Sequence, residues 1–153
     1  MTGRLIVQGG AVVTAEGKIR ADVVARDGKI VAITQAATPA PNDTVVDARG
    51  CYVLPGVIDA HTHIKLDTGI YKTDDDWFTG TRAAAFGGVT TVIDFATQVR
   101  GQTFAQAMEN RHAEAQGAAI DYALHCMITD LPAGEEARLA ELLDLGVTAF
   151  KVY

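Results

Sequence analysis

The sequence has 153 residues, of which 48% are hydrophobic and 21% are charged, and its formal net charge at pH 7 is −6. This composition is that of a folded globular chain, and the length is enough for one modest core. Because the lysines and arginines are scattered and outnumbered by carboxylates, nucleic acid and anionic membrane surfaces are disfavoured as partners.

The N-terminus starts with Met1-Thr2-Gly3-Arg4 and lacks the apolar stretch and cleavage site of a secretory signal. No segment approaches the roughly 20 apolar residues of a membrane-spanning helix. The two cysteines, Cys51 and Cys126, form no short metal or redox spacing and no disulfide framework. We therefore expect a cytoplasmic protein.

Residues 1–54 are predicted to form a small β domain. The β-rich runs are Leu5–Gln8, Ala11–Thr14, Ile19–Arg26, Lys29–Thr34, Thr44–Asp47 and Cys51–Leu54. Glycine pairs separate the early runs, and Asp27-Gly28 is a strong hairpin signal. Residues 35–43 contain two prolines and are predicted to be a loop. This part of the chain has no obvious catalytic grouping.

Residues 55–153 alternate between predicted strands and helices. The strands are Val57–His63, Val89–Phe95, Ile120–Ile128 and Val147–Tyr153, and the helices are Asp74–Phe86, Thr103–Gln116 and Pro132–Leu145. Carboxylates open the first helix, Thr103 can cap the second, and glycines follow all three. The alternation predicts a parallel sheet covered by helices, and four strands with three helices make half of a (β/α)₈ barrel. We expect a segment of a longer chain rather than a smaller open sheet.

The sharpest chemical signal is Asp59-Ala60-His61-Thr62-His63, at the end of the first predicted barrel strand. Because side chains alternate between the two faces of a strand, His61 and His63 point the same way, with Cα atoms roughly 6.6 Å apart. Neutral imidazole is a common zinc ligand, and barrel enzymes build their active sites at the carboxyl ends of the strands. A bare His-x-His is more often a pair of surface residues, but its place in a βα series favours a metal site.

Lys151 is the second signal. If Phe150 and Val152 face the covering helices, Lys151 points into the barrel. Burial of an ammonium group is costly and favours the neutral amine. A neutral amine can react with carbon dioxide to give a carbamate, whose two oxygens could bridge two divalent cations. Taken alone, Lys151 is more simply an ordinary lysine whose ammonium group reaches water at a strand end.

Four runs in order resemble the hydantoinase/dihydropyrimidinase family of cyclic amidohydrolases, and most of all D-hydantoinases of the phenylhydantoinase type. These runs are Gly50–His63 (GCYVLPGVIDAHTH), Asp75–Ala85 (DDWFTGTRAAA), Gly87–Asp94 (GGVTTVID) and Phe150–Tyr153 (FKVY). The resemblance covers essentially the whole chain as the N-terminal part of such a protein. Their ordered combination is far more specific than His-x-His alone.

The resemblance implies an amidohydrolase-type (β/α)₈ TIM barrel, with its first four strands in residues 55–153, preceded by a small β-sandwich-type domain at residues 1–54. It implies two divalent metal ions, zinc or else manganese or another ion. His61 and His63 would bind the more buried ion, and a carboxylated Lys151 would bridge both. A hydroxide between the ions would attack a ring carbonyl, opening a hydantoin or dihydropyrimidine to an N-carbamoyl amino acid.

In the family, two further histidines, an aspartate that shuttles the proton and a tyrosine that stabilises the oxyanion complete the site. These residues lie beyond residue 153, so we expect the chain to be inactive by itself. The resemblance also implies a homotetramer or homodimer.

Other polar residues near the predicted strand ends are open to two interpretations. Asp59 lies on the histidine face and is either a carboxylate that orients a ligand ring or a buried structural aspartate. Asp94 and His125 end the second and third strands, where polar groups that face a pocket collect, but packing or hydrogen bonding to neighbours also explains both.

Residues 64–72 resemble a loop that shapes the pocket for the exocyclic group of the substrate. The apolar candidates for this pocket are Leu66, Ile70, Tyr71 and, from the fourth strand, Tyr153.

Several alternatives share part of this pattern. An allantoinase or dihydroorotase would use the same ligands, but a dihydroorotase needs cations for its substrate carboxylate, and only Lys65 and Lys72 are near. A non-catalytic dihydropyrimidinase-like assembly protein would lack the ligands. A mononuclear deaminase would not need Lys151. Metal counting separates these classes, with about two ions, none and one ion per chain respectively.

Overall fold

The computed structural model describes residues 3–131, 133–134 and 136–152. The chain divides into two compact units, Met1–Pro55 and Gly56–Tyr153. Among the described residues, no helix combines the length and the apolar character needed to cross a membrane.

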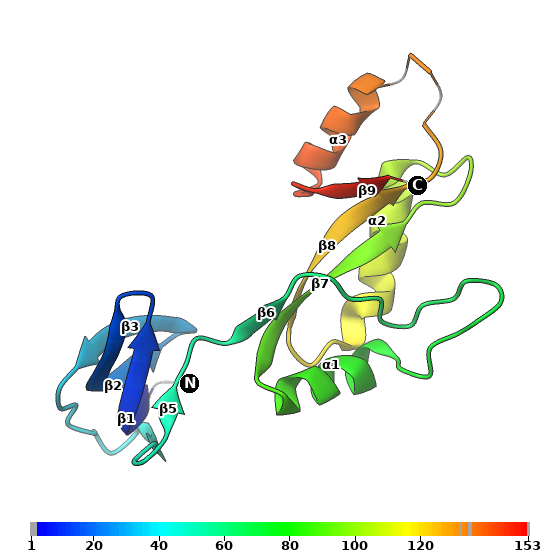
Figure 1. The fold of residues 1–153 in the computed structure, drawn as a ribbon. Coiled ribbons are helices and arrows are strands. Elements are labelled where there is room, and N and C mark those ends of the chain that lie inside the picture. Colours follow the sequence, from blue (N-terminus) through cyan, green and yellow to red (C-terminus); the bar gives the residue numbers. More distant parts are fainter. Residues whose placement is uncertain (1–2, 132, 135, 153) are drawn as a thin grey trace. The chain divides into compact units, whose positions relative to one another are not determined.

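The first unit is a mixed five-stranded sheet. Its strands are β1 (Leu5–Thr14), β2 (Gly17–Arg26), β3 (Lys29–Thr34), β4 (Thr44–Asp47) and β5 (Tyr52–Val53). The order is β3-β2-β1-β4, with β5 also paired to β1 (Figure 1). Strands β1, β2 and β3 run antiparallel, whereas β4 and β5 run parallel to β1. The described residues of this unit form one sheet, so the β-sandwich-type domain stays a prediction.

Gly9 and Gly10 lie inside one continuous strand, so the prediction of two short strands separated by a turn was wrong. The pairing of β1 with β2 shifts between Val7 and Gly10, which marks a β-bulge, and Gly9 has φ of +79°. The Gly9 N–H donates to the Asp22 carboxylate at 2.7 Å. A glycine pair permits a bulge as readily as a turn, because it adopts positive φ at no steric cost.

The predicted hairpin at Asp27-Gly28 is confirmed. Arg26 pairs with Lys29 across a two-residue connection, and both turn residues have positive φ, +50° at Asp27 and +75° at Gly28. Positive φ at both central positions is the requirement of a type I′ turn, which matches the twist of the strands it joins.

The second unit is a curled, parallel half-barrel. Its elements are β6 (Val57–Asp59), α1 (Trp77–Phe86), β7 (Val89–Thr97), α2 (Phe104–Glu114), η1 (Ala115–Gly117), β8 (Asp121–Ile128), η2 (Glu136–Arg138), α3 (Leu139–Asp144) and β9 (Phe150–Val152). All four strands are parallel in the order β6-β7-β8-β9 (Figure 1). Helix α1 packs on β7, and α2 packs on both β7 and β8. The four strands and three helices agree with the predicted first half of a barrel.

The helix boundaries differ from the predicted ones at both ends of the unit. Helix α1 begins at Trp77 rather than Asp74, because Asp76 is its N-cap and accepts a hydrogen bond from the Thr79 N–H at 2.7 Å. The Thr103 cap of α2 is confirmed. The predicted helix from Pro132 is shorter: η2 and α3 span residues 136–144, and Pro132 lies outside the described residues.

The core of the half-barrel lies between the sheet and its helices. Its most buried side chains are Trp77, Val92, Ala96, Phe104, Cys126, Leu142 and Val147. Burial raises the pKa of the Cys126 thiol to about 11, so this cysteine is a small apolar core residue. Packing of this core holds the strands in position, and their register determines which residues point to the opposite face of the sheet.

Candidate metal centre

His61 and His63 lie just beyond the end of β6. The predicted strand Val57–His63 was too long, because β6 ends at Asp59, and the next backbone bond to β7 runs from the Thr62 N–H to the Ile93 carbonyl at 3.0 Å. The two imidazoles nevertheless lie close together, with ring centroids 5.2 Å apart and planes at 74°. The strand end therefore presents two ring nitrogen donors in one place.

Both imidazoles rest against the phenyl ring of Phe95 on β7. The His61 ring centroid lies 4.7 Å from the Phe95 centroid, and the His63 ring stacks at 5.0 Å with an interplanar angle of 24°. Phe95 is 6% exposed. The aromatic contacts fix where the two imidazoles sit relative to the sheet.

Lys151 reaches the same phenyl ring from the far edge of the sheet. Its Nζ lies 5.2 Å from the Phe95 ring centroid. The register explains this contact: Lys151 pairs with Met127, which pairs with Thr97, two residues after Phe95 and on the same face. The structure thus gathers the three predicted ligand side chains around one ring.

Phe150 and Val152 lie on the helix side of the sheet, as expected, because Phe150 pairs with Cys126, which pairs with Ala96, and both partners belong to the core under the helices. Phe150 and Val152 are 48% and 69% exposed, because β9 is the last strand of the sheet. Lys151 is half-buried and lies on the Phe95 face of the sheet. Its direction follows from strand alternation alone.

His125 also joins this cluster. Its ring centroid lies 5.4 Å from that of Phe95, with which it pairs across β7 and β8. Among the described residues, no three His, Cys, Asp or Glu side chains converge as a metal-binding group. The donor set formed here is different in kind, because it contains imidazoles and a lysine amine.

The environment of His63 favours the neutral imidazole. Burial lowers the pKa of His63, the nearby Asp94 carboxylate opposes this shift, and the charges of Lys151, His61 and Arg111 lower the pKa further. A neutral imidazole has a lone pair to offer a cation, whereas a protonated ring does not.

The secondary candidates are less closely gathered. Asp59 is exposed, and its carboxylate accepts a hydrogen bond from the His61 backbone N–H at 3.2 Å, so it was not the buried aspartate of one interpretation. Ile70 and Tyr71 are 82% and 76% exposed in a loop closed by the Thr68–Tyr71 backbone bond. Tyr153 lies outside the described residues.

A cavity of about 560 Å³ adjoins the cluster. Leu66, which is half-buried, lines it together with His63, Phe95, Thr97 and Met127. The other side of the cavity is formed by residues of α2. Of the predicted pocket residues that the structure describes, Leu66 is the one that contributes to this wall.

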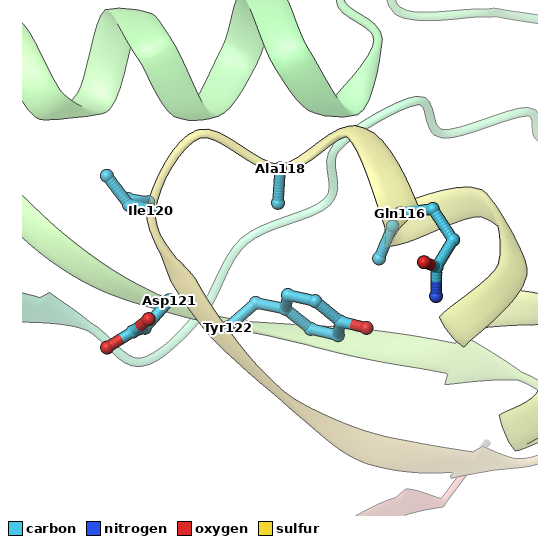
Figure 2. Close-up of a pocket in the computed structure, with 6 residues that line it drawn as sticks. Gln116, Ala118, Ile120, Asp121 and Tyr122 are labelled. Atoms are coloured by element: carbon cyan, nitrogen blue, oxygen red, sulfur yellow. The ribbon is translucent and has the colours of Figure 1, made fainter.

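A second cavity, of about 510 Å³, lies at the opposite end of β8. Figure 2 shows Ile120, Asp121 and Tyr122 from the start of β8 together with Gln116 and Ala118. Among the described residues that line it, Asp121 alone is charged. It offers no imidazole and lies at the amino end of the strand, so it is not the candidate site.

Three residues of the site region were missed or undervalued in the sequence. Asp94 is completely buried and forms an ion pair with Arg111 at 2.6 Å. Arg111 could have been found, because it occupies the buried side of α2 that also carries Phe104, Ala107 and Met108. Phe95 carried no such signal, since an apolar residue in a strand is ordinary.

A parallel half-barrel with imidazoles and a lysine at the carboxyl edge of its sheet places the chain among the amidohydrolase-type TIM barrels. The crystal structure of dihydropyrimidinase from Brevibacillus agri NCHU1002 superposes with a TM-score of 0.89 at 38% identity, over 96% of this chain and 32% of that one. A prolidase at 21% identity and a TM-score of 0.55 shares the fold.

Sequence relatives narrow the class. The D-hydantoinase of Streptomyces coelicolor is 40% identical over 100% of this chain and 34% of its own length. The D-phenylhydantoinase of Escherichia coli is 36% identical over 98% of this chain and 33% of its own. No family model matches. The chain belongs to the hydantoinase/dihydropyrimidinase family, and it spans about a third of the length of the curated relatives it matches.

Proposed function

We propose that the protein hydrolyses the ring amide of a hydantoin or a dihydropyrimidine, giving an N-carbamoyl amino acid, in a reaction that depends on two divalent ions, zinc in the first place. The observation that carries this proposal is the gathering of His61, His63 and Lys151 around Phe95 at the carboxyl edge of the sheet. Relatives that bear the names D-hydantoinase and dihydropyrimidinase support the substrate class.

The residues present fit such a metal pair. His61 and His63 supply two adjacent imidazoles, and the lowered pKa of His63 keeps its ring in the form that binds cations. Lys151 Nζ lies 5.2 Å from the centroid of the same phenyl ring and is an amine that can be carboxylated. We assign His61, His63 and a carboxylated Lys151 as the residues of this chain that would hold the two ions.

When bound, two divalent ions lower the pKa of a shared water and polarise the ring carbonyl, so that a hydroxide nucleophile exists near neutral pH. The contribution of this chain is positional. Phe95 keeps water from one side of the imidazoles and fixes their spacing. The adjoining cavity of about 560 Å³ is large enough for a five- or six-membered ring with a substituent.

The charge around the cavity favours a neutral substituent. Lys72 forms an ion pair with Asp67 at 2.7 Å, so its charge is already compensated. Leu66, Thr97 and Met127 form an uncharged part of the wall beside Phe95. Among the described residues, the charged ones that line the cavity are Lys65, Asp67, Arg111 and Glu114, of which Asp67 is paired with Lys72, and Arg111 is paired with Glu114 and Asp94. We therefore propose a 5-substituted hydantoin or a dihydropyrimidine ahead of a substrate that carries a carboxylate, such as dihydroorotate.

The test is to purify the complete protein, count its metal ions by mass spectrometry and assay it on phenylhydantoin, dihydrouracil and allantoin. We expect about two divalent ions per chain and ring opening of phenylhydantoin or dihydrouracil. Lys151→Arg keeps the positive charge but cannot form a carbamate, so its metal content should fall.

Each alternative has its own result in the same experiment. Turnover of allantoin alone would indicate an allantoinase in place of a hydantoinase or dihydropyrimidinase. One ion per chain would indicate a mononuclear deaminase, and a protein without metal or turnover would be an assembly protein. Two bound ions with no turnover on any of the three substrates would end the proposal of cyclic amide hydrolysis.

A further inference from the structure

The segment that carries His63 is held by side chains rather than by the sheet. Strand β6 ends at Asp59. In the described part of the chain, the next backbone hydrogen bond to β7 is the one from the Thr62 N–H to the Ile93 carbonyl. Immediately after Ile64 the chain turns away through Lys65, whose φ is +50°. Such a conformation persists where the surroundings determine it.

The Asp94 carboxylate supplies this restraint from β7. Its Oδ2 accepts hydrogen bonds from the Thr62 hydroxyl at 3.0 Å and from the Ile64 backbone N–H at 2.7 Å. Thr62 and Ile64 are the two neighbours of His63 in the chain. One carboxylate oxygen therefore binds the residue on each side of the proposed ligand, Thr62 through its hydroxyl and Ile64 through its backbone N–H.

Arg111 completes the restraint from α2. Its Nε and Nη2 donate to Asp94 Oδ1 at 3.2 and 2.6 Å, and Nη2 also donates to the Ile64 carbonyl. The amide of Ile64 is thus held by Asp94 and its carbonyl by Arg111. Since the Asp94 side chain is completely buried and that of Arg111 is 11% exposed, these charge-assisted bonds are shielded from water.

The Arg111 guanidinium has two further contacts, with residues of α1 and α2. It lies 4.9 Å from the Trp77 ring centroid, and its Nη1 donates to Glu114 at 2.6 Å. The N–H groups of Arg111 donate to Asp94 on β7, Glu114 on α2 and the Ile64 carbonyl, and the guanidinium lies beside the Trp77 ring of α1. The guanidinium is therefore oriented by three elements at once.

Asp94 and Phe95 are consecutive residues that point to opposite faces of β7. Because successive residues of a strand point to opposite faces, the carboxylate faces the helices and the phenyl ring faces the imidazoles. His63 is held through its neighbours' backbone from one side and through its ring, stacked on Phe95, from the other. Its orientation is thus fixed before any cation arrives.

We propose that Asp94 and Arg111 are a positioning pair that sets the backbone of the His63 segment for metal binding. This inference rests on the proposed metal role of His63. Arg111 also lines the cavity of about 560 Å³, but its guanidinium donates to Asp94, Glu114 and the Ile64 carbonyl, so we assign the pair a positioning role and not a catalytic one. Their effect passes through Thr62 and Ile64 to the imidazole between them.

The experiment measures the dissociation constant of Zn²⁺ by competition with a chromophoric chelator, on the complete protein. Asp94→Asn is expected to weaken zinc binding by about 10- to 100-fold, the range for residues that orient ligands. An asparagine whose side-chain oxygen still accepts from the Ile64 N–H turns its NH₂ group, a donor, toward the Arg111 guanidinium. Arg111→Lys, which keeps the charge and loses the paired bonds, should fall between Asp94→Asn and wild type.

Asp22→Asn is the matched control. Asp22 is also a buried aspartate that holds chain segments, accepting bonds from the backbone N–H groups of Gly9 and Ala37 in the first unit. It should lower stability while leaving zinc affinity at the wild-type value. A general loss of stability would weaken zinc binding in both aspartate variants, which would contradict a positioning role.

Two further arms keep the outcome decisive. If Asp94→Asn does not fold, Thr62→Val decides, since it removes one hydroxyl and should weaken zinc binding about two- to tenfold, as expected for one hydrogen bond. A folded Asp94→Asn protein with wild-type zinc affinity overturns the positioning pair alone. A wild-type protein that binds no zinc overturns the proposed function, and the positioning pair with it.

Discussion

Phe95 is the residue on which the candidate site is assembled. Its ring contacts the imidazoles of His61, His63 and His125 and lies under the Nζ of Lys151. These groups come from three different strand ends, so the phenyl ring is the shared surface that relates them. It also separates the donors from the core on the other side of the sheet.

Replacement of Phe95 by alanine should cost about 3–5 kcal/mol in the free energy of unfolding, the range for a buried phenylalanine. Phe95→Leu keeps most of the volume and should cost less, while it still removes the flat surface on which His63 stacks. Chemical unfolding of the two variants measures the difference. Equal stability of wild type and Phe95→Ala would show that the ring is not part of a packed cluster.

Sequence reasoning located the ligands but not their support. His61, His63 and Lys151 stand out because their spacing and strand-end positions have chemical meaning. Phe95 is hidden among other apolar strand residues, and the role of Asp94 depends on a partner 17 residues away, Arg111. A local pattern cannot show which helix returns over which strand, so that pair emerges only from the fold.

At the scale of elements, the N-terminus of α2 is held by a reciprocal cap. The Thr103 hydroxyl accepts a bond from the Gln106 N–H at 3.1 Å, and the Gln106 side chain accepts one from the Thr103 N–H at 3.0 Å. This cap begins the helix that carries Arg111. Its loss should loosen the helix from its first turn.

Thr103→Ala should cost about 1 kcal/mol of local stability, because it removes the hydroxyl that accepts the hydrogen bond from the Gln106 N–H. Hydrogen exchange of the α2 amides measures this change. The exposed Thr148, which precedes β9, provides the control variant Thr148→Ala, with an expected change within about 0.5 kcal/mol. The same exchange rates in both variants would contradict the cap.

The loop at residues 35–43 is attached to Arg4, the residue before β1, by an ion pair that should respond to acid. The Arg4 guanidinium, helped by the backbone N–H groups of Ala40 and Arg4, holds the pKa of Asp43 well below its ordinary value of 3.8. The unfolded carboxyl takes up a proton at a higher pH than the folded one. The stabilisation is therefore complete above about pH 5 and decreases as the pH falls through 4 and below.

Limited proteolysis of the loop at pH 6 and at pH 3, with an acid-active protease, checks this dependence. Cleavage should accelerate at the lower pH in the wild type. Asp43→Asn should be cleaved faster at pH 6 and show a smaller change between the two pH values. An identical pH response in the variant would assign the effect to other carboxylates.

Element types were predictable, whereas several of their boundaries were not. Alternating patterns and turn residues located β3, β4 and the hairpin between β2 and β3 well. The early end of β6 was not visible, because Ala60–His63 continues the pattern of a strand while its bonds go to Ile93 and Asp94 instead of a regular ladder. Side-chain competitors of this kind decide where an element stops.

At the scale of the whole molecule, both edges of the parallel sheet are apolar and open. Ile58 on β6 is 62% exposed, and Phe150 and Val152 on β9 are 48% and 69% exposed. Unpaired strands with apolar side chains are templates for association.

Residues 1–153, expressed alone, should therefore self-associate and show no turnover on phenylhydantoin. Analytical ultracentrifugation measures the association, and Ile58→Lys together with Val152→Lys should reduce it by placing charge on both edges. A monodisperse wild-type segment with full activity would contradict both expectations. The homotetramer or homodimer implied by the family is measured in the same way on the complete protein.

The function of β7 depends on which of its residues face each side of the sheet. Asp94 and Phe95 are consecutive, and one is turned to the helices while the other is turned to the imidazoles. Deletion of a single residue before Asp94 would exchange inside and outside along the rest of the strand. The phenyl ring would then enter the helix layer and the carboxylate would meet the histidines. One deletion would thus remove both the ring on which the imidazoles rest and the carboxylate that holds the His63 segment.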